Sequence, residues 1–166
     1  MWNPTLARHR KRLLFSLAAI LLCSACSHAP KQMPRPVSYR YRLPAPQLSA
    51  AYNQPYTVKG YRFVPLRTSR GYRASGIASW YGFESGNRTA MGQPFNPEGL
   101  SAAHRTLPLP TWVRVTNLEN GSRITVVVND RGPFVPGRLL DLSYGAAKRL
   151  RLVDRGTARV FVEAIQ

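Results

Sequence analysis

Short runs in which apolar and polar residues alternate make up much of the chain after residue 75. This two-residue period is typical of a strand that buries one face. The runs span residues 77–81, 112–116, 123–128 and 158–164. Asn120-Gly121 lies between the second and third runs and is a strong signal for a β-hairpin turn. The pattern therefore predicts several short strands, two of them joined as a hairpin.

A helical period marks residues 143–150. Ala146, Ala147 and Leu150 give an apolar face at three-to-four spacing, and Ser143 is placed to cap the first turn. Many short strands with a single short helix favour a small all-β barrel, because closure removes the exposed edges of a sheet.

Residues 54–75 lead into this barrel. Two β-prone stretches flank Lys59-Gly60, which predicts a short hairpin over residues 56–65. Residues 26–53 have no apolar period, and their prolines disfavour regular helix, so we expect an extended tether. These prolines are Pro30, Pro34, Pro36, Pro44 and Pro46. The alternating segment Tyr39–Arg42 leaves a second role open, adhesion to glycan or membrane.

The apolar run Leu13–Leu22 follows a basic segment and precedes small residues. It is too short to cross a membrane and predicts a secretory signal peptide over residues 1–25. Cys26 follows Cys23-Ser24-Ala25, which resembles a lipobox, so we expect Cys26 to be lipidated. Ser27 resembles the pattern of lipoproteins sent to the outer membrane, which predicts anchoring at its periplasmic face. An ordinary cleaved signal with an incidental cysteine is the alternative.

Charge limits the classes of binding partner, and the positions of the cysteines limit disulfides and metal sites. The chain has 24 Lys and Arg against 7 Asp and Glu, a formal net charge of +17. Four of the basic residues precede residue 26, so the mature protein would carry about +13. An exported chain does not meet nucleic acid, so anionic lipid and the acidic cell wall are the expected partners. Both cysteines lie at or before residue 26, which excludes a disulfide or a thiolate metal site in the mature domain.

Asp130 is the first candidate for chemistry. It ends an apolar strand run, and a carboxyl at the rim of a barrel is partly desolvated, which raises its pKa toward that of a working acid. The alternative is a turn residue paired with Arg131, which would lower the pKa. His104 follows small residues and is either a cleft group or a satisfied core histidine. No ligand cluster accompanies it, so neither a metal nor a cofactor is expected.

Trp80 and Tyr81 are candidate sugar platforms, because aromatic rings present broad apolar faces on which sugars stack. Strand alternation sends neighbouring side chains to opposite faces, so one of the two rings is expected to face a groove. Either ring also fits a core position.

Three blocks of sequence together resemble the rare lipoprotein A (RlpA) family. They read Gly76-Ile-Ala-Ser-Trp-Tyr-Gly82, Leu100-Ser-Ala-Ala-His-Arg-Thr-Leu-Pro108 and Val128-Asn-Asp-Arg-Gly-Pro-Phe134. The resemblance begins near residue 54 and implies a six-stranded double-psi β-barrel over residues 76–166. It also implies a lytic transglycosylase that cleaves MurNAc-GlcNAc bonds of peptidoglycan, with strands that lack stem peptides as the favoured substrate.

The same resemblance implies the residues of the site. Asp130 matches the family's catalytic aspartate, and His104 matches a cleft histidine that would orient Asp130 or sugar hydroxyls. Gln93 stands where the family commonly has a glutamate implicated in catalysis, and an amide cannot exchange a proton. The expected substrate-binding residues are Ser79, Trp80, Tyr81, Thr89, Asn96 and Arg131.

Only one carboxylate is thus supported, whereas ordinary glycosidases need two. A lytic transglycosylase manages with one, because the C6 hydroxyl of the sugar is its own nucleophile. The sequence favours lytic cleavage in cell-wall remodelling and daughter-cell separation, with division proteins as possible partners. Two alternatives stay open: a non-catalytic peptidoglycan-binding or division-associated lipoprotein, which Gln93 favours, and a true glycan hydrolase.

Overall fold

The computed structural model describes residues 44–165. The expected signal peptide, the lipidated Cys26 and most of the tether lie outside the described residues. Between residues 44 and 165, no helix is both long enough and apolar enough to cross a membrane.

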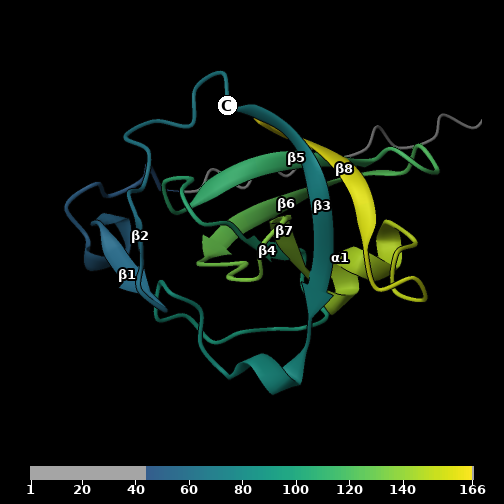
Figure 1. The fold of residues 1–166 in the computed structure, drawn as a ribbon, viewed down its shortest axis with the longest axis horizontal. Coiled ribbons are helices and arrows are strands. Elements are labelled where there is room, and N and C mark those ends of the chain that lie inside the picture. Colours follow the sequence, from purple (N-terminus) through teal and green to yellow (C-terminus); the bar gives the residue numbers. More distant parts are fainter. Residues whose placement is uncertain (1–43, 166) are drawn as a thin grey trace, which may run out of the picture. The chain divides into compact units, whose positions relative to one another are not determined.

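Six strands close into a barrel, as the sequence predicted (Figure 1). The strands are β3 (Arg73–Tyr81), β4 (Ser101–Ala103), β5 (Thr111–Asn117), β6 (Arg123–Asp130), β7 (Arg138–Ser143) and β8 (Ala158–Ala164). Their order around the barrel is β3-β7-β4-β6-β5-β8. The β3–β7 and β4–β6 pairs are parallel, and the other four pairs are antiparallel. The fold is the double-psi β-barrel that we expected.

The strand periods build the core. Val113 and Val115 of β5 are fully buried, whereas Arg114 between them is exposed, as alternation requires. Burying each such valine contributes about 1.5–3 kcal/mol relative to leaving it in water. The same cluster takes in side chains from the other strands and the helix, among them Val126, Val128, Leu140, Leu142, Val160, Val162 and Leu150.

A bulge in β6 sets the register at one end of the barrel. The ladder between β4 and β6 skips Asn129, so Ala103 lies opposite Asp130. On its other side, Ala103 lies opposite Asp141 of β7. A carboxylate therefore flanks Ala103 on each neighbouring strand. Bulges commonly re-aim side chains beside active sites.

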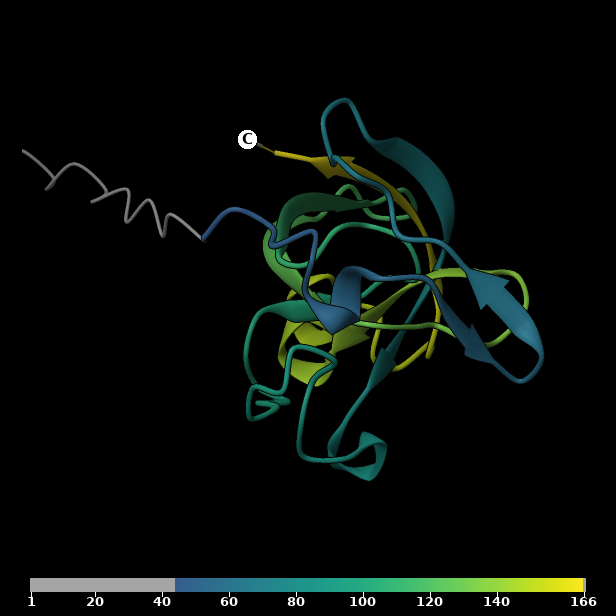
Figure 2. The same cartoon turned by 90° about the vertical axis from the view of Figure 1, so that its left-hand side faces the viewer.

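The hairpin before the barrel forms as predicted. Strands β1 (Tyr56–Val58) and β2 (Tyr61–Phe63) pair antiparallel across Lys59 and Gly60. The φ angles of these two residues are +49° and +80°, and positive φ at both positions is the geometry of a two-residue type I′ turn. The 3₁₀ helix η1 (Ala51–Asn53) precedes this separate two-stranded sheet, which lies beside the barrel in both views (Figures 1 and 2).

Helix α1 (Tyr144–Arg149) follows β7 directly. The Ser143 side chain accepts a hydrogen bond from the Ala146 N–H, which confirms the predicted cap. Gly145 is required here, because a Cβ at this position would lie 2.2 Å from the carbonyl oxygen of Glu98. This close approach holds the end of the long segment between β3 and β4 against the helix.

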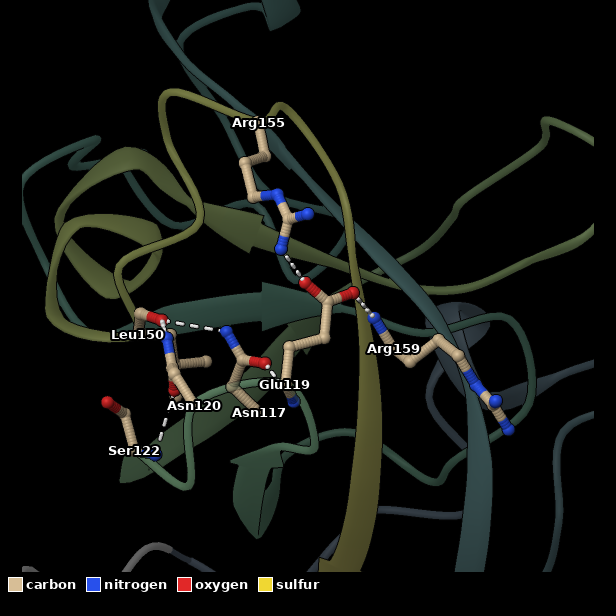
Figure 3. Close-up of polar contacts among 7 residues, drawn as sticks. All are labelled: Asn117, Glu119, Asn120, Ser122, Leu150, Arg155 and Arg159. Atoms are coloured by element: carbon tan, nitrogen blue, oxygen red, sulfur yellow. Dashed lines mark hydrogen bonds and ion pairs between the residues drawn. The ribbon is translucent and has the colours of Figure 1, made fainter.

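Figure 3 shows the polar contacts of the β5–β6 turn. The turn precedes Arg123 and so lies at the opposite end of β6 from Asp130. Side-chain amides of Asn117 and Asn120 both donate to the Leu150 carbonyl, at 3.0 and 3.1 Å. One carboxylate oxygen of Glu119 accepts from the backbone N–H of Arg159 at 3.2 Å. This polar cluster ties the hairpin to α1 and to the start of β8, so the barrel is braced at the end away from Asp130.

Strands β4 and β7 had no clear signal in the sequence. β4 contains only Ser101-Ala102-Ala103, which have no strong β preference, and its two neighbouring strands impose the extended conformation. β7 is followed directly by α1, so in the sequence the apolar residues of the strand cannot be separated from the apolar face of the helix. The first barrel strand also begins at Arg73, earlier than the alternation at residues 77–81 indicates.

Candidate active site

A pocket lies over Ala103 at the end of β6. It is lined by Tyr81, Ser85, Ala103, Asp130, Arg131, Gly132, Pro133, Phe134 and Asp141. These residues come from four barrel strands, from the 3₁₀ helix η2 (Phe83–Ser85) and from the loop after β6. The pocket therefore holds two carboxyl groups, whereas the sequence led us to expect one.

Asp130 has the environment that the sequence predicted. Its Oδ1 accepts hydrogen bonds from the backbone N–H groups of Ala90, at 2.7 Å, and Arg131, at 2.8 Å. Partial burial raises the pKa of the Asp130 carboxyl, and this effect exceeds the lowering by the two hydrogen bonds and by the Arg131 charge. Of the two interpretations open at the sequence level, desolvation therefore prevails over pairing with Arg131.

Arg131 lines the pocket, and its guanidinium is bonded to groups of the protein. Its Nη1 donates to the Leu107 carbonyl at 2.7 Å, and its Nη2 donates to the Tyr52 carbonyl at 2.8 Å and to Asn53 Oδ1 at 2.9 Å. The guanidinium also lies over the ring of Tyr56. Arg131 thus holds Tyr52 and Asn53 at the rim of the pocket. The last residues of the expected extended tether instead form η1 and belong with the lead-in hairpin.

The contacts of His104 fit the interpretation as a satisfied core histidine and not the expected cleft group. It is 3% exposed, and its Nδ1 accepts from the backbone N–H groups of Thr106, at 3.1 Å, and Leu107, at 2.9 Å. The ring proton is therefore on Nε2, which donates to the Tyr72 hydroxyl at 2.8 Å. Burial lowers the pKa of His104 to about 4, so the ring is neutral at pH 7. His104 organises the loop after β4 and does not line the pocket.

Gln93 belongs to a tight loop that reaches Asp130. The Gln93 carbonyl accepts from the Thr89 N–H at 2.9 Å, and the next residue, Ala90, donates to Asp130. The exposed Gln93 side chain accepts from the amide of Asn129 at 3.2 Å. The position of the family glutamate therefore lies beside the candidate acid, but its side chain here is an amide that cannot exchange a proton.

The two glutamates nearest to this loop in sequence do not replace the missing acid. Glu84 is exposed, and its Oε1 accepts from the Gly82 N–H at 2.8 Å. Glu98 pairs with Lys148 of α1 at 3.6 Å. Neither glutamate lines the pocket.

Of the two candidate sugar platforms, Tyr81 is the one that lines the pocket. Its ring stacks on Phe95, with centroids 4.7 Å apart. Burial, together with the nearby charge of Asp130, raises the pKa of Tyr81, so the hydroxyl stays protonated. Trp80 instead packs against Tyr144 of α1 and the hydrophobic core. The prediction that the two rings face opposite sides is confirmed, and Trp80 is not brought to the pocket.

The other expected binding residues, Ser79, Thr89 and Asn96, do not line the pocket. Ser79 is 2% exposed and donates its hydroxyl proton to Asp141, so it supports a pocket carboxylate from behind. Asn96 accepts from the Glu98 N–H at 3.1 Å and shapes a turn outside the pocket. Thr89 is buried beside the loop that reaches Asp130.

Three buried polar atoms around this site have no hydrogen-bond partner among residues 44–165. They are the Tyr81 hydroxyl, Thr89 Oγ1 and Asn129 Oδ1. Of these three residues only Tyr81 lines the pocket, and the Ser101 side chain interacts with its hydroxyl and lowers its pKa by less than burial raises it.

Asp141 is the functional candidate that the sequence reasoning missed. Burial raises the pKa of its carboxyl, whereas the Ser79 hydroxyl and the Arg138 charge lower it to a smaller extent. The available signal was the run Leu139-Leu140-Asp141-Leu142, in which one carboxylate interrupts an apolar stretch. A charged group is costly to bury, so such a position calls for a reason beyond packing.

Residues 73–162 match a protein family described as lytic transglycolases, and the chain belongs to this family. The sequence resembles several proteins named endolytic peptidoglycan transglycosylase RlpA. It is 43% identical to the one from Pseudomonas aeruginosa over 174 residues (90% of this chain, 51% of the relative). It is 40% identical to the one from Yersinia pestis over 162 residues (91% and 45%). The chain thus spans about half the length of these relatives.

Solved structures resemble the barrel more distantly. A Streptomyces papain inhibitor is 24% identical, with a TM-score of 0.48 over 58% of this chain and 96% of the inhibitor. An apo expansin from Clavibacter michiganensis is 19% identical, with a TM-score of 0.47 over 57% of this chain and 51% of the expansin.

Proposed function

We propose that this protein is a lytic transglycosylase that cleaves the MurNAc-GlcNAc bond of peptidoglycan, with Asp130 as the acid. The observation that carries the proposal is the half-buried Asp130 carboxyl, whose pKa is raised by burial in a pocket that Tyr81 and Asp141 also line. Membership of the lytic transglycolase family supports the reaction class.

The chemistry needs a proton donor but no activated water. The protonated Asp130 carboxyl gives its proton to the glycosidic oxygen as the C1–O bond breaks. The C6 hydroxyl of the same MurNAc attacks C1 and passes its proton to the Asp130 carboxylate just formed, which yields a 1,6-anhydroMurNAc end and a free GlcNAc hydroxyl. Attack within one sugar gains the large proximity advantage of an intramolecular reaction. The position of Asp130 Oδ1 on two backbone N–H groups leaves Oδ2 as the oxygen that carries the proton.

The substrate class follows from the relatives, which are named endolytic peptidoglycan transglycosylases. We propose that the preferred substrate is a glycan strand without stem peptides, in cell-wall remodelling and daughter-cell separation. The excess of basic residues supports a polyanionic partner such as the wall. The sequence around Cys26 supports a lipid anchor at the periplasmic face of the outer membrane, with division proteins as further partners.

One observation favours a second function, binding of peptidoglycan without cleavage. Gln93 lies beside Asp130 through its bond to Asn129, at the position where the family commonly has a glutamate. Loss of a working acid or base typically lowers a rate by about 10²- to 10⁴-fold. If the missing glutamate were essential, the pocket would still bind glycan through Tyr81 and its other lining residues.

Digestion of isolated cell-wall sacculi distinguishes these functions. The full-length protein, purified in detergent, is incubated with sacculi whose stem peptides have been removed by an amidase, and the released fragments are analysed by mass. We expect 1,6-anhydroMurNAc ends from the wild type and none from Asp130→Asn. Co-sedimentation with sacculi by both proteins, without release by either, would show that the protein binds and does not cleave. Untreated sacculi test the preference for strands that lack stem peptides.

A further inference from the structure

We propose that Asp141 is a second catalytic residue of this pocket, the base that removes the C6 hydroxyl proton while Asp130 protonates the leaving oxygen. This inference rests on the proposed function. In that mechanism Asp130 alone gives a proton to the leaving oxygen and then takes one from the C6 hydroxyl, whereas here each carboxyl group carries out one of the two transfers. It also accounts for a working site in a chain that has Gln93 in place of a glutamate.

The barrel register places the two carboxylates on either side of the pocket floor. Ala103 of β4 pairs with Asp130 of β6 on one side and with Asp141 of β7 on the other. Neighbouring strands lie about 4.8 Å apart, so the two Cα atoms are separated by about 10 Å. The methyl side chain of Ala103 between them leaves the space above it open, and all three residues line the pocket.

The surroundings of Asp141 prepare it to accept a proton. From β3, the Ser79 hydroxyl donates to Asp141 Oδ1, and the Tyr81 ring stands beside the same pocket. From its own strand, Arg138 contributes positive charge. From β6 and the following loop come Asp130 and Arg131, and β4 contributes the uncharged Ala103. A hydroxyl donor and a cation favour the ionised carboxylate, whereas burial keeps it basic enough to take a proton.

Hydrogen bonding distinguishes the two carboxyl groups. Asp130 accepts two backbone N–H bonds through Oδ1 and lies near the charge of Arg131, whereas Asp141 accepts from the Ser79 hydroxyl and lies near Arg138. Burial raises the pKa of both carboxyl groups above that of an exposed one, so each can take part in proton transfer. The acid role goes to Asp130, whose Oδ2 accepts neither of the two N–H bonds, and the base role goes to Asp141.

The proton balance of the step is complete within the pocket. The Asp130 proton moves to the bridging oxygen, and the C1–O bond electrons go to that oxygen as the GlcNAc hydroxyl leaves. The C6 oxygen forms the new bond to C1, and the C6 proton moves to Asp141. The reaction leaves Asp130 ionised and Asp141 protonated, and exchange with solvent through the open pocket restores the starting state.

The test compares the pH dependence of kcat/KM for the full-length wild type with that of Asp141→Asn and Ser79→Ala. Asp141→Asn should lower kcat by about 10²- to 10⁴-fold with little change in KM. Ser79→Ala removes a donor that lowers the pKa of Asp141, so the acid limb of the profile should move to higher pH. Asp154→Asn, which removes an exposed carboxylate between α1 and β8, is the control for charge and should leave kcat and the profile unchanged.

The outcomes separate this inference from the proposed function. If the wild type forms no 1,6-anhydroMurNAc, or Asp130→Asn retains activity, the proposed function fails. If the wild type is active and Asp130→Asn is not, but Asp141→Asn keeps kcat within about tenfold, Asp141 is not the base. Should Asp141→Asn lose its thermal unfolding transition, the Ser79→Ala profile decides, and an acid limb at the wild-type pH overturns the inference.

Discussion

The backbone N–H of Ala90 donates to Oδ1 of Asp130 over 2.7 Å, across 40 positions of sequence. This bond holds the loop that carries Gln93 against the candidate acid. The conformation of the loop and the chemistry of the carboxyl are therefore linked, and substitutions at Asp130 affect both unless the acceptor is retained.

An asparagine at position 130 should separate these two effects. Asp130→Asn keeps an oxygen for the Ala90 and Arg131 N–H groups, and it removes a carboxyl whose ionised form is disfavoured by burial. We expect this variant to be at least as stable as the wild type at pH 7, yet inactive. Asp130→Ala leaves the two N–H groups without their acceptor and should lower the free energy of unfolding by about 1–3 kcal/mol. Urea denaturation measures both, and equal stability of the two variants would contradict the role of this bond.

His104 should make stability depend on pH. Its pKa is about 4 in the folded protein against 6.5 for an unperturbed histidine, so the unfolded state binds the extra proton between these values. His104 therefore makes its full contribution to the free energy of unfolding above pH 6.5, and this contribution is lost as the pH falls toward 4. The free energy of unfolding should fall by about 3 kcal/mol over this range. Urea denaturation at a series of pH values measures it.

His104→Asn is the matched control for that measurement. An asparagine oxygen takes the place of Nδ1 as acceptor for the Thr106 and Leu107 N–H groups but does not titrate in this range. The difference in unfolding free energy between wild type and variant should shrink as the pH falls from 7 to 4. A difference that stays constant with pH would show that His104 is not held neutral by its surroundings.

Arg131 should act on the lead-in segment. Arg131→Lys keeps the charge but removes the fork of donors that bonds Tyr52, Asn53 and Leu107. We expect faster hydrogen exchange in residues 50–63 and a loss of stability of about 2 kcal/mol. Arg123→Lys, at an exposed position on β6, is the control. Unchanged exchange in residues 50–63 would mean that the lead-in is held by its aromatic contacts alone.

Gln93→Glu tests whether the family glutamate is needed. If Asp130 and Asp141 carry the chemistry, this variant should change kcat by less than about tenfold, because the wild type already has an acid and a base. Gln93→Ala should likewise remain active, with a modest rise in KM. Activity that appears only in Gln93→Glu would identify the wild type as a binding protein whose catalytic function is lost.

Periodic strands and strong turns could be predicted from the sequence. The β5–β6 hairpin, the Lys59-Gly60 turn, the Ser143 cap and the last strand rest on local patterns, and each is present. β4 and β7 could not be predicted, because their conformation comes from neighbouring strands more than from their own residues. Asp141 was missed for the same reason, since its strand was not recognised.

The surroundings of single polar residues were harder to predict than the fold. The partly desolvated state of Asp130 could be predicted, because a carboxyl that ends an apolar strand is partly buried by its position alone. His104 and Arg131 match family motifs equally well, but both form hydrogen bonds within the protein, and only their three-dimensional contacts reveal this. A sequence motif shows which residue is present, but it does not show which neighbouring groups form hydrogen bonds with its side chain.

Cleavage of amidase-treated sacculi in water enriched in oxygen-18 tests most directly that Asp130 drives a non-hydrolytic cleavage. Mass spectrometry of the released fragments should detect unlabelled 1,6-anhydroMurNAc ends with the wild type and no release with Asp130→Asn. Reducing ends that carry oxygen-18 would show that water is the nucleophile, and anhydro ends formed by Asp130→Asn would show that another group is the acid.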